Sequence, residues 1–134
     1  MTNKTLKNTT ILVVEDNVIN MKLFKDLLNF HKYNILEAYT GFEALEIIEK
    51  HHKEINLILM DIQLPEINGI DLIQMLKSNP KFIEIPVIAL SAHAMDNDIE
   101  TALKFGCKAY ITKPVQIEEF INTVKMYLNA NDQD

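Results

Sequence analysis

Several residue types are scarce in this chain, and each shortage excludes a class of protein. Its 134 residues include one cysteine, which excludes an internal disulfide, and the neighbours of Cys107 favour a small buried hydrophobic side chain over a reactive thiol. The three glycines, Gly41, Gly69 and Gly106, form neither of the glycine-rich motifs that hold the phosphates of nucleotides. A nucleotide-binding module is therefore not expected.

Long apolar runs and an excess of basic residues are also missing. No uninterrupted apolar run approaches the roughly 18–20 residues that span a bilayer, and residues 1–10 lack the features of a signal peptide, so we expect a cytoplasmic protein. Arginine is absent, and the net charge is −6 with a sequence pI of about 5.2. Because nucleic-acid sites present basic patches, we expect the partners to be proteins or cations.

What the chain does contain is a regular alternation of two hydrophobic patterns. Short apolar runs rich in β-branched residues alternate with longer segments of helical period, which is typical of a parallel sheet covered by helices. There are five such units, with strands predicted at 10–14, 34–38, 56–60, 86–90 and 108–111. Thr40 and Glu43 form a capping-box pattern at the start of the second helix, and Gly106 is a natural end for the fourth.

Five alternating units predict an α/β fold with an open, doubly wound parallel sheet and five helices, most often in the strand order 2-1-3-4-5. We expect one domain over residues 10–128, a flexible N-terminal extension at 1–9 and a polar C-terminal tail at 129–134. In this order strands 1 and 3 are neighbours, and ligands bind beyond the carboxyl ends of the strands, where the winding reverses. The residues that follow the strands are therefore the candidate site.

Carboxylates follow two of these neighbouring strands. Glu15 and Asp16 come directly after the first strand, and Asp61 comes directly after the third. Mutual repulsion between converging carboxylates is relieved by a cation, and oxygen ligands favour Mg²⁺, with Mn²⁺ as a possible substitute. We expect Asp16 and Asp61 to be direct ligands and Glu15 to act partly through water, with the backbone carbonyl of Gln63 adding another oxygen.

The next two strands end in groups that complement a phosphate. Ser91 ends the fourth strand with a hydroxyl, and Lys113 follows the fifth strand with an ammonium group. Together with the metal, these groups would surround a tetrahedral dianion attached to Asp61. Each residue alone also has a structural explanation, as a helix cap or a solvated charge, so the prediction depends on their joint placement on one edge of the sheet.

The segments "VVEDN", "LMDIQLPEINGI", "ALSAHA" and "AYITKP" carry these residues, and with them the chain resembles the receiver domain of two-component response regulators. The resemblance covers about residues 11 to 128. It implies a flavodoxin-like fold in which Asp61 accepts a phosphoryl group from a histidine kinase or a phosphotransfer protein. Two departures from the family pattern are Ser91, where threonine is commoner, and Val115, where an aromatic residue is frequent.

The resemblance also assigns roles to the other site residues. It implies that Glu15, Asp16 and Asp61 bind Mg²⁺ and that Lys113 and Ser91 contact the phosphoryl oxygens. Tyr110 would turn inward as Ser91 moves toward the phosphate, and the bond between Lys113 and Pro114 would be cis. These roles describe a switch in which Ser91 and Tyr110 move together.

The resemblance further implies a signalling protein rather than an enzyme, one that assists only its own phosphorylation and dephosphorylation. Because no DNA-binding module is attached, we expect the output to be a protein contact through the helix before Gly106, the strand at 108–111 and the last helix. Segments 17–33 and 57–69 are most similar to single-domain members that act in cell-cycle control. That similarity predicts a related role for this chain.

Besides the nucleotide-binding module, two alternatives are considered on the residues alone. A phosphatase or dehalogenase of the haloacid type also uses an Asp after a strand, but it needs a second Asp two residues later, and Gln63 occupies that position. An inactive receiver that acts only as a binding scaffold is the other alternative. Within an active receiver, Gln63 and His93 could screen or orient the water that hydrolyses the phosphate, although for His93 a partly exposed loop residue is the favoured interpretation.

Overall fold

The computed structural model describes residues 9–92 and 97–132, with side chains described up to residue 128. Within these ranges, five parallel strands form one sheet in the order β2-β1-β3-β4-β5. The strands are β1 (Thr10–Val14), β2 (Asn34–Ala38), β3 (Ile55–Asp61), β4 (Val87–Ser91) and β5 (Ala109–Thr112). The predicted sheet order is therefore confirmed.

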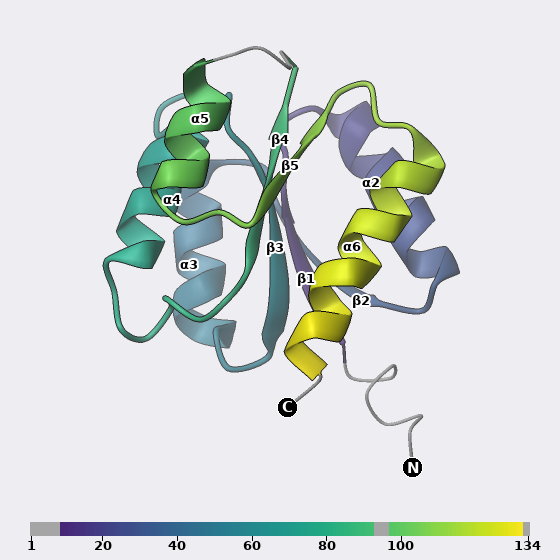
Figure 1. Cartoon of the computed structure of the whole chain (residues 1–134), viewed down its shortest axis with the longest axis horizontal. Helices are drawn as coiled ribbons and strands as arrows, with labels where there is room; N and C mark the ends of the chain where they lie inside the picture. The colour runs from purple at the N-terminus through teal and green to yellow at the C-terminus, as the bar shows by residue number, and fades with distance from the viewer. Residues whose placement is uncertain (1–8, 93–96, 133–134) are drawn as a thin grey trace.

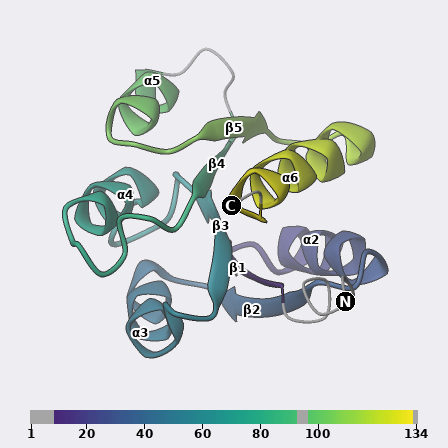
Figure 2. The ribbon, with the colours of Figure 1, turned by 60° about the horizontal axis from the view of Figure 1, so that its bottom comes forward.

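Helices cover both faces of this sheet (Figure 1). One face carries α2 and α6, and the other carries α3, α4 and α5, as the turned view in Figure 2 also shows. The helices are α2 (Val18–Phe30), α3 (Gly41–His51), α4 (Gly69–Lys77), α5 (Asn97–Lys104) and α6 (Ile117–Asp132). Because both faces are covered, the central strands are continuous apolar runs rather than alternating ones.

Two hydrophobic cores lie on either side of the sheet. On the α2 and α6 side, Phe24 and Phe120 stack with ring centroids 5.3 Å apart, and both side chains are almost fully buried. On the other side, Ile48 of α3 and Leu72 of α4 pack in the same cluster as Ile58 of β3. The packing on both faces fixes the sheet and therefore the positions of the strand ends.

The helices begin at side-chain caps close to the strand ends. Asn17, Thr40 and Asn68 each accept a hydrogen bond from a backbone N–H three residues later, at 2.9, 3.0 and 2.9 Å respectively. The predicted capping pair differs in one contact, because the Glu43 carboxylate accepts from the backbone N–H of Tyr39, at 2.7 Å, rather than from that of Thr40. The caps start each helix directly beyond the sheet edge that carries the candidate site.

Three strands, β3, β4 and β5, each end one residue later than the sequence pattern predicts. Asp61 is the last residue of β3, where it is in register with Leu90, and Ser91 is the last residue of β4, where it is in register with Thr112. Gly106, with φ at 119°, follows α5 as expected. Asp61 and Ser91 therefore stand on the sheet itself, whereas Glu15 and Lys113 directly follow β1 and β5.

Several predictions fall at or outside the described parts of the chain. His93 lies outside the described residues, and the tails at 1–9 and 129–134 lie largely outside them or have no described side chains, so these predictions are untested. Among the described helices, none has both the length and the apolar character that a membrane span requires.

Candidate functional site

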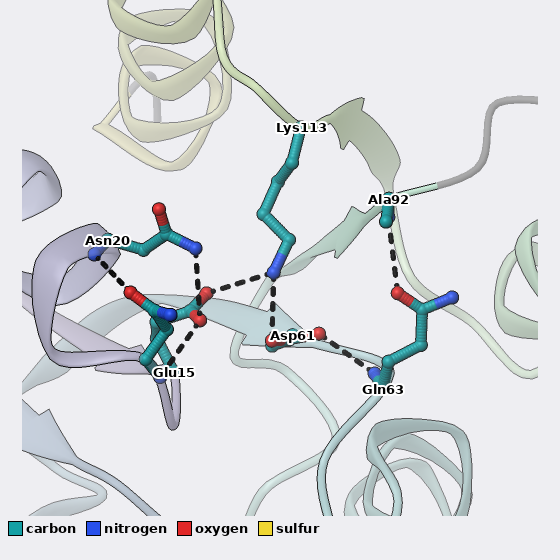
Figure 3. A network of polar contacts seen from close by, with 7 residues as sticks. Glu15, Asn20, Asp61, Gln63, Ala92 and Lys113 are labelled. Atoms are coloured by element: carbon teal, nitrogen blue, oxygen red, sulfur yellow. Dashed lines mark hydrogen bonds and ion pairs between the residues drawn. The ribbon is translucent and has the colours of Figure 1, made fainter.

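The candidate site lies at the carboxyl edge of the sheet, where the ends of β1, β3 and β5 meet. The Lys113 ammonium follows β5 and bridges two carboxylates, with Nζ 3.0 Å from Asp61 Oδ2 and 3.3 Å from Glu15 Oε1 (Figure 3). These partners are 52 and 98 residues from Lys113 in the sequence. The strand order 2-1-3-4-5 therefore assembles the site from distant segments.

Glu15 is held in place by the first turn of α2. Its Oε2 atom accepts a hydrogen bond from the backbone N–H of Asn17, at 3.2 Å, and a longer one from the Asn20 side-chain amide, at 3.4 Å. The Glu15 side chain is fully buried. Burial and then the negative charge of Asp61 raise the pKa of Glu15, and the nearby Lys113 opposes both effects.

Asp61 is held from two sides. Its Oδ1 atom accepts from the backbone N–H of Gln63, at 2.8 Å, while Oδ2 accepts from Lys113. Only 2% of Asp61 is exposed to solvent. The carboxylate therefore has a fixed orientation at the end of β3, with both oxygens engaged.

The chain folds back onto the backbone of Asp61 at Gly69. A Cβ atom added at Gly69 would lie in contact with the Asp61 carbonyl oxygen and only 2.5 Å from the Cα atom of Ile62. Glycine is the residue that permits such a close approach between two backbone segments. The loop between β3 and α4 can therefore pass directly against the backbone of Asp61 and Ile62.

Lys113 remains charged in this setting. Burial by itself lowers the pKa of Lys113, but the hydrogen bond and the charge of Asp61, followed by those of Glu15, outweigh it, and the net pKa is raised. The side chain is 16% exposed. Lys113 therefore supplies a fixed positive charge at one side of Asp61.

The predicted metal ligands are brought together. Glu15, Asp16 and Asp61 each offer a carboxylate oxygen, and these three atoms lie within 4.8 Å of one another, with Asp16 exposed to solvent. Among the described residues, three carboxylates here face one ammonium group, that of Lys113. Hard oxygen donors with an excess of negative charge, one of them open to solvent, fit a hydrated divalent cation such as Mg²⁺.

The remaining predicted residues lie nearby on the same edge. Ser91 is fully buried at the end of β4, and its carbonyl accepts from the backbone N–H of Lys113, at 2.7 Å. The Gln63 side chain accepts from the backbone N–H of Ala92, at 3.2 Å. Tyr110 on β5 is 42% exposed, so the structure places its ring outward. The peptide bond between Lys113 and Pro114 is cis, as expected.

Two residues that shape the site were missed in the sequence. Asn20 supports Glu15 from α2, but its spacing from Asn17 indicates only a helix start. Gly69 follows Asn68, a pair typical of a turn, and its contact with the Asp61 backbone is visible only in the folded chain. In both cases the local sequence is also typical of an ordinary helix cap or turn, so it does not indicate a contact with the site.

Comparison with known proteins gives a consistent result. The model of the response regulator receiver domain matches residues 11–125. Among curated relatives, the polar-differentiation response regulator DivK of Brucella ovis is 45% identical over 119 residues, covering 89% of this chain and 95% of the relative. DivK of Brucella anthropi is 44% identical over the same shares of the two chains.

Solved structures share the fold over most of their length. A response regulator from Chloroflexus aurantiacus has a TM-score of 0.86 at 26% identity, covering 92% of this chain and 99% of that one. The receiver domain of a sensor histidine kinase from Pseudomonas aeruginosa, solved with a magnesium ion coordinated in its active-site cleft, has a TM-score of 0.83 at 27% identity and covers 91% and 98%.

The predicted flavodoxin-like fold and the predicted family are therefore confirmed. The family match spans the edge of the sheet on which Glu15, Asp61 and Lys113 meet. On this ground the chain belongs to the response regulator receiver domains, a family of signalling proteins.

Proposed function

We propose that Asp61 is the phosphoacceptor of this receiver domain and that a histidine kinase or a histidine phosphotransfer protein is the donor. The observation that carries the proposal is the position of the Asp61 carboxylate at the end of the central strand β3. There it lies 3.0 Å from the Lys113 ammonium and beside the carboxylates of Glu15 and Asp16. Glu15 is also buried, contacts Lys113 and belongs to the same carboxylate cluster, but Asp61 stands on the central strand β3 and has the shorter contact with Lys113.

The chemistry follows from these groups. An oxygen of the Asp61 carboxylate attacks the phosphorus atom of a phosphohistidine, the bond between nitrogen and phosphorus breaks, and the electron pair returns to the imidazole. The transition state spreads negative charge over the equatorial phosphoryl oxygens, and the ammonium of Lys113 is already in place to stabilise it. Its role is electrostatic, because it neither gains nor loses a proton.

Glu15, Asp16, Asp61 and the backbone carbonyl of Gln63 are the groups that would hold Mg²⁺, or Mn²⁺ in its place. The metal, when bound, supplies the positive charge that phosphoryl oxygens require beyond what Lys113 provides. The clustering of three carboxylate oxygens and the magnesium site of the Pseudomonas aeruginosa receiver support this assignment.

The phosphoryl group would act through a switch on β4 and β5. The acyl phosphate carries roughly −1.5 to −2 charge in place of the single carboxylate charge of Asp61, and it offers three acceptor oxygens, by analogy with other phosphorylated side chains. The Ser91 hydroxyl would move toward these oxygens, and the outward ring of Tyr110 would turn into the space that Ser91 leaves. This biases a pre-existing equilibrium between two conformations.

The output surface would be the one made by α5, β5 and α6. Leu103, Tyr110 and Met126 contribute exposed apolar side chains to these elements, at 40%, 42% and 59% exposure. Such side chains suit a protein partner whose affinity depends on the position of Tyr110. The similarity to DivK, named a polar-differentiation response regulator, supports a downstream role in the cell cycle or in cell division.

A haloacid-type phosphatase or dehalogenase is disfavoured by the structure around Gln63. The side chain at this position is a neutral amide that accepts a hydrogen bond from Ala92, so it cannot serve as a general acid. Incubation with excess p-nitrophenyl phosphate separates the two functions. A phosphoacceptor gives no sustained release of nitrophenol, whereas continued turnover would favour the enzyme.

Acetyl phosphate with Mg²⁺ tests the phosphoacceptor directly. We expect intact mass spectrometry to show one added phosphoryl group on the wild type and none on Asp61→Asn. Reduction with borohydride should convert residue 61 to homoserine, which locates the acyl phosphate. The matched control is Asp26→Asn, an exposed carboxylate paired only with Lys22 in the described structure, which should be modified like the wild type.

Phosphate that persists on Asp61→Asn would overturn the assignment. Circular dichroism of the variant separates a loss of the acceptor from a loss of folding. A phosphotransfer profile against the sensor kinases of the source organism then identifies the donor.

A further inference from the structure

Gln63 connects the reactive carboxylate to the loop that follows β4. Its backbone N–H donates to Asp61 Oδ1 at 2.8 Å, and its side-chain Oε1 accepts from the backbone N–H of Ala92 at 3.2 Å (Figure 3). Gln63 and Ala92 are 29 residues apart in the sequence. Gln63 therefore links the Asp61 carboxylate at the end of β3, through two hydrogen bonds, to the residue that follows β4.

The Gln63 backbone is a fixed anchor for this connection. Its neighbours Ile62 and Leu64 are 1% and 6% exposed and belong to the hydrophobic core, and the Ile62 N–H donates to the carbonyl of Leu90 at 3.0 Å. A bond from such an anchor to Ala92 restrains Ala92 rather than Gln63. Gln63 itself is half-buried.

Restraint of Ala92 bears directly on Ser91. Ala92 follows Ser91 in the chain, and Ser91 is fully buried as the last residue of β4. Any displacement of the Ser91 backbone toward Asp61 carries the N–H of Ala92 with it. The bond to Gln63 must therefore lengthen or break whenever the end of β4 moves.

We propose that Gln63 is a positioning residue for the switch, a latch that holds Ala92, and through it Ser91, in the unmodified position. The proposal depends on Asp61 being the phosphoacceptor. When the carboxylate becomes an acyl phosphate, its charge moves to the phosphoryl oxygens, and the bond from the Gln63 N–H loses its charge assistance. Phosphorylation thereby weakens the hydrogen bond from the Gln63 N–H to Asp61, while the new phosphoryl oxygens attract the hydroxyl of Ser91.

The side-chain chemistry of position 63 makes the latch specific. The hydrogen bond requires an acceptor atom two methylene groups from the Cα atom, which glutamine and glutamate both provide. Methionine matches the length but offers only a weak sulfur acceptor, and asparagine carries the amide one methylene group too short. Gln63→Glu keeps both the oxygen acceptor and the side-chain length. Gln63→Met keeps the length without a strong acceptor, and Gln63→Asn keeps the amide on a shorter side chain.

The test uses solvent exchange of the Ala92 amide, measured by NMR on the metal-free, unmodified protein at pH 7. Gln63→Met and Gln63→Asn should each speed exchange by at least about threefold, as expected for losing one exposed hydrogen bond, while Gln63→Glu should exchange no faster than the wild type. Gln63→Met should also move the amide signals of Ser91 and Tyr110 part of the way toward their phosphorylated positions without phosphate.

Three results would overturn the latch: unchanged Ala92 exchange in Gln63→Met, exchange in Gln63→Glu as fast as in Gln63→Met, or amide signals that do not shift. Intact mass after acetyl phosphate is measured on the same samples. A wild type that gains no phosphoryl group would overturn the proposed function, whereas normal phosphorylation with unchanged exchange in Gln63→Met would overturn the latch alone.

Discussion

Lys113 shows how one side chain makes a crowded acidic site stable. Its ammonium contacts both Asp61 and Glu15, and these contacts raise its pKa in spite of burial. A raised lysine pKa contributes stability that is complete below the unfolded value of about 10.5 and is lost as the pH rises through the folded pKa. Lys113 therefore supports the fold as well as the proposed chemistry.

Lys113→Ala should lower the free energy of unfolding at pH 7.5 by roughly 3 kcal/mol, because it leaves two buried carboxylates without their cation. The already raised pKa of Glu15 would rise further, so this loss shrinks as the pH falls and Glu15 becomes protonated. Urea denaturation at pH 7.5 and pH 5 measures the effect, with exposed Lys22→Ala as the control.

Lys113→Ala also distinguishes a role of Lys113 in metal binding from a role in the response to phosphorylation. Mg²⁺ binding should survive in Lys113→Ala, since none of the proposed metal ligands is removed, while the phosphorylation-linked change in fluorescence or NMR signals is weakened. A full response in this variant would show that Lys113 does not contact the phosphoryl group.

Cys107 is the opposite case, a side chain with reactive chemistry that the fold suppresses. It is 6% exposed, its thiol donates to the carbonyl of Ala109 at 3.6 Å, and burial raises its pKa to about 11. Because the thiolate is the reactive form, alkylation by iodoacetamide at pH 8 should be slower in the native protein than in urea by on the order of a hundredfold or more. With one cysteine in the chain, mass spectrometry follows a single site, and equal rates in both conditions would contradict the burial of this thiol.

The turn between β3 and α4 positions Asp61, the proposed phosphoacceptor, through its backbone. β3 carries Asp61 to the sheet edge, and α4 begins at Gly69, whose N–H donates to the Ile62 carbonyl at 3.4 Å. The absence of a side chain at Gly69 permits this return of the chain against Asp61. Changes in this turn should therefore act on Asp61 without touching its side chain.

Gly69→Ala should destabilise the fold by about 1–3 kcal/mol, because the added methyl group meets backbone atoms of Asp61 and Ile62 that cannot move independently. Phosphorylation by acetyl phosphate should also slow as Asp61 is displaced. Gly41→Ala is the graded control: its Cβ would lie 3.0 Å from the Ile67 side chain, and its φ is not in the left-handed region, so the loss should be smaller. Equal unfolding midpoints for wild type and Gly69→Ala would contradict this close approach.

The negative charge of the domain is distributed unevenly. The net charge is −6, and three carboxylates converge at one edge of the sheet. The two cores hold that edge rigid from both faces, so the carboxylates cannot separate to relieve their repulsion. A cation bound there should therefore stabilise the folded chain as a whole, because the unfolded chain has no such cluster.

Saturating Mg²⁺ should raise the thermal midpoint. At a concentration one hundred times the dissociation constant the gain is about 2.7 kcal/mol, or roughly 10 °C for a domain of this size. NaCl at equal ionic strength should give a smaller rise, and EDTA should reverse the effect of Mg²⁺. Asp16→Asn should reduce the shift, while Asp71→Asn, an exposed carboxylate at the start of α4, should preserve it. Equal midpoints in MgCl₂ and NaCl would argue against a metal site here.

The sequence by itself determined the elements, their order and the carboxylates, hydroxyl and ammonium group that the strand ends bring to one edge. Short apolar runs and helical periods are local patterns that are read within a few positions of the chain, so the strands were predicted to within two residues at each end. The alternation of strands and helices fixed the winding and placed Glu15, Asp61, Ser91 and Lys113 on one edge. These are consequences of hydrophobic burial and chain connectivity.

Only the tertiary structure decided how those residues meet. The contacts of Lys113 with Asp61 and Glu15, of Gln63 with Ala92, and of Gly69 with the Asp61 backbone join segments whose distance depends on strand register and on the path of each loop. Register and path result from the packing of the two cores, which involves every element at once and has no local signature in the sequence. The latch at Gln63 and the glycine beneath Asp61 are therefore properties of the folded chain alone.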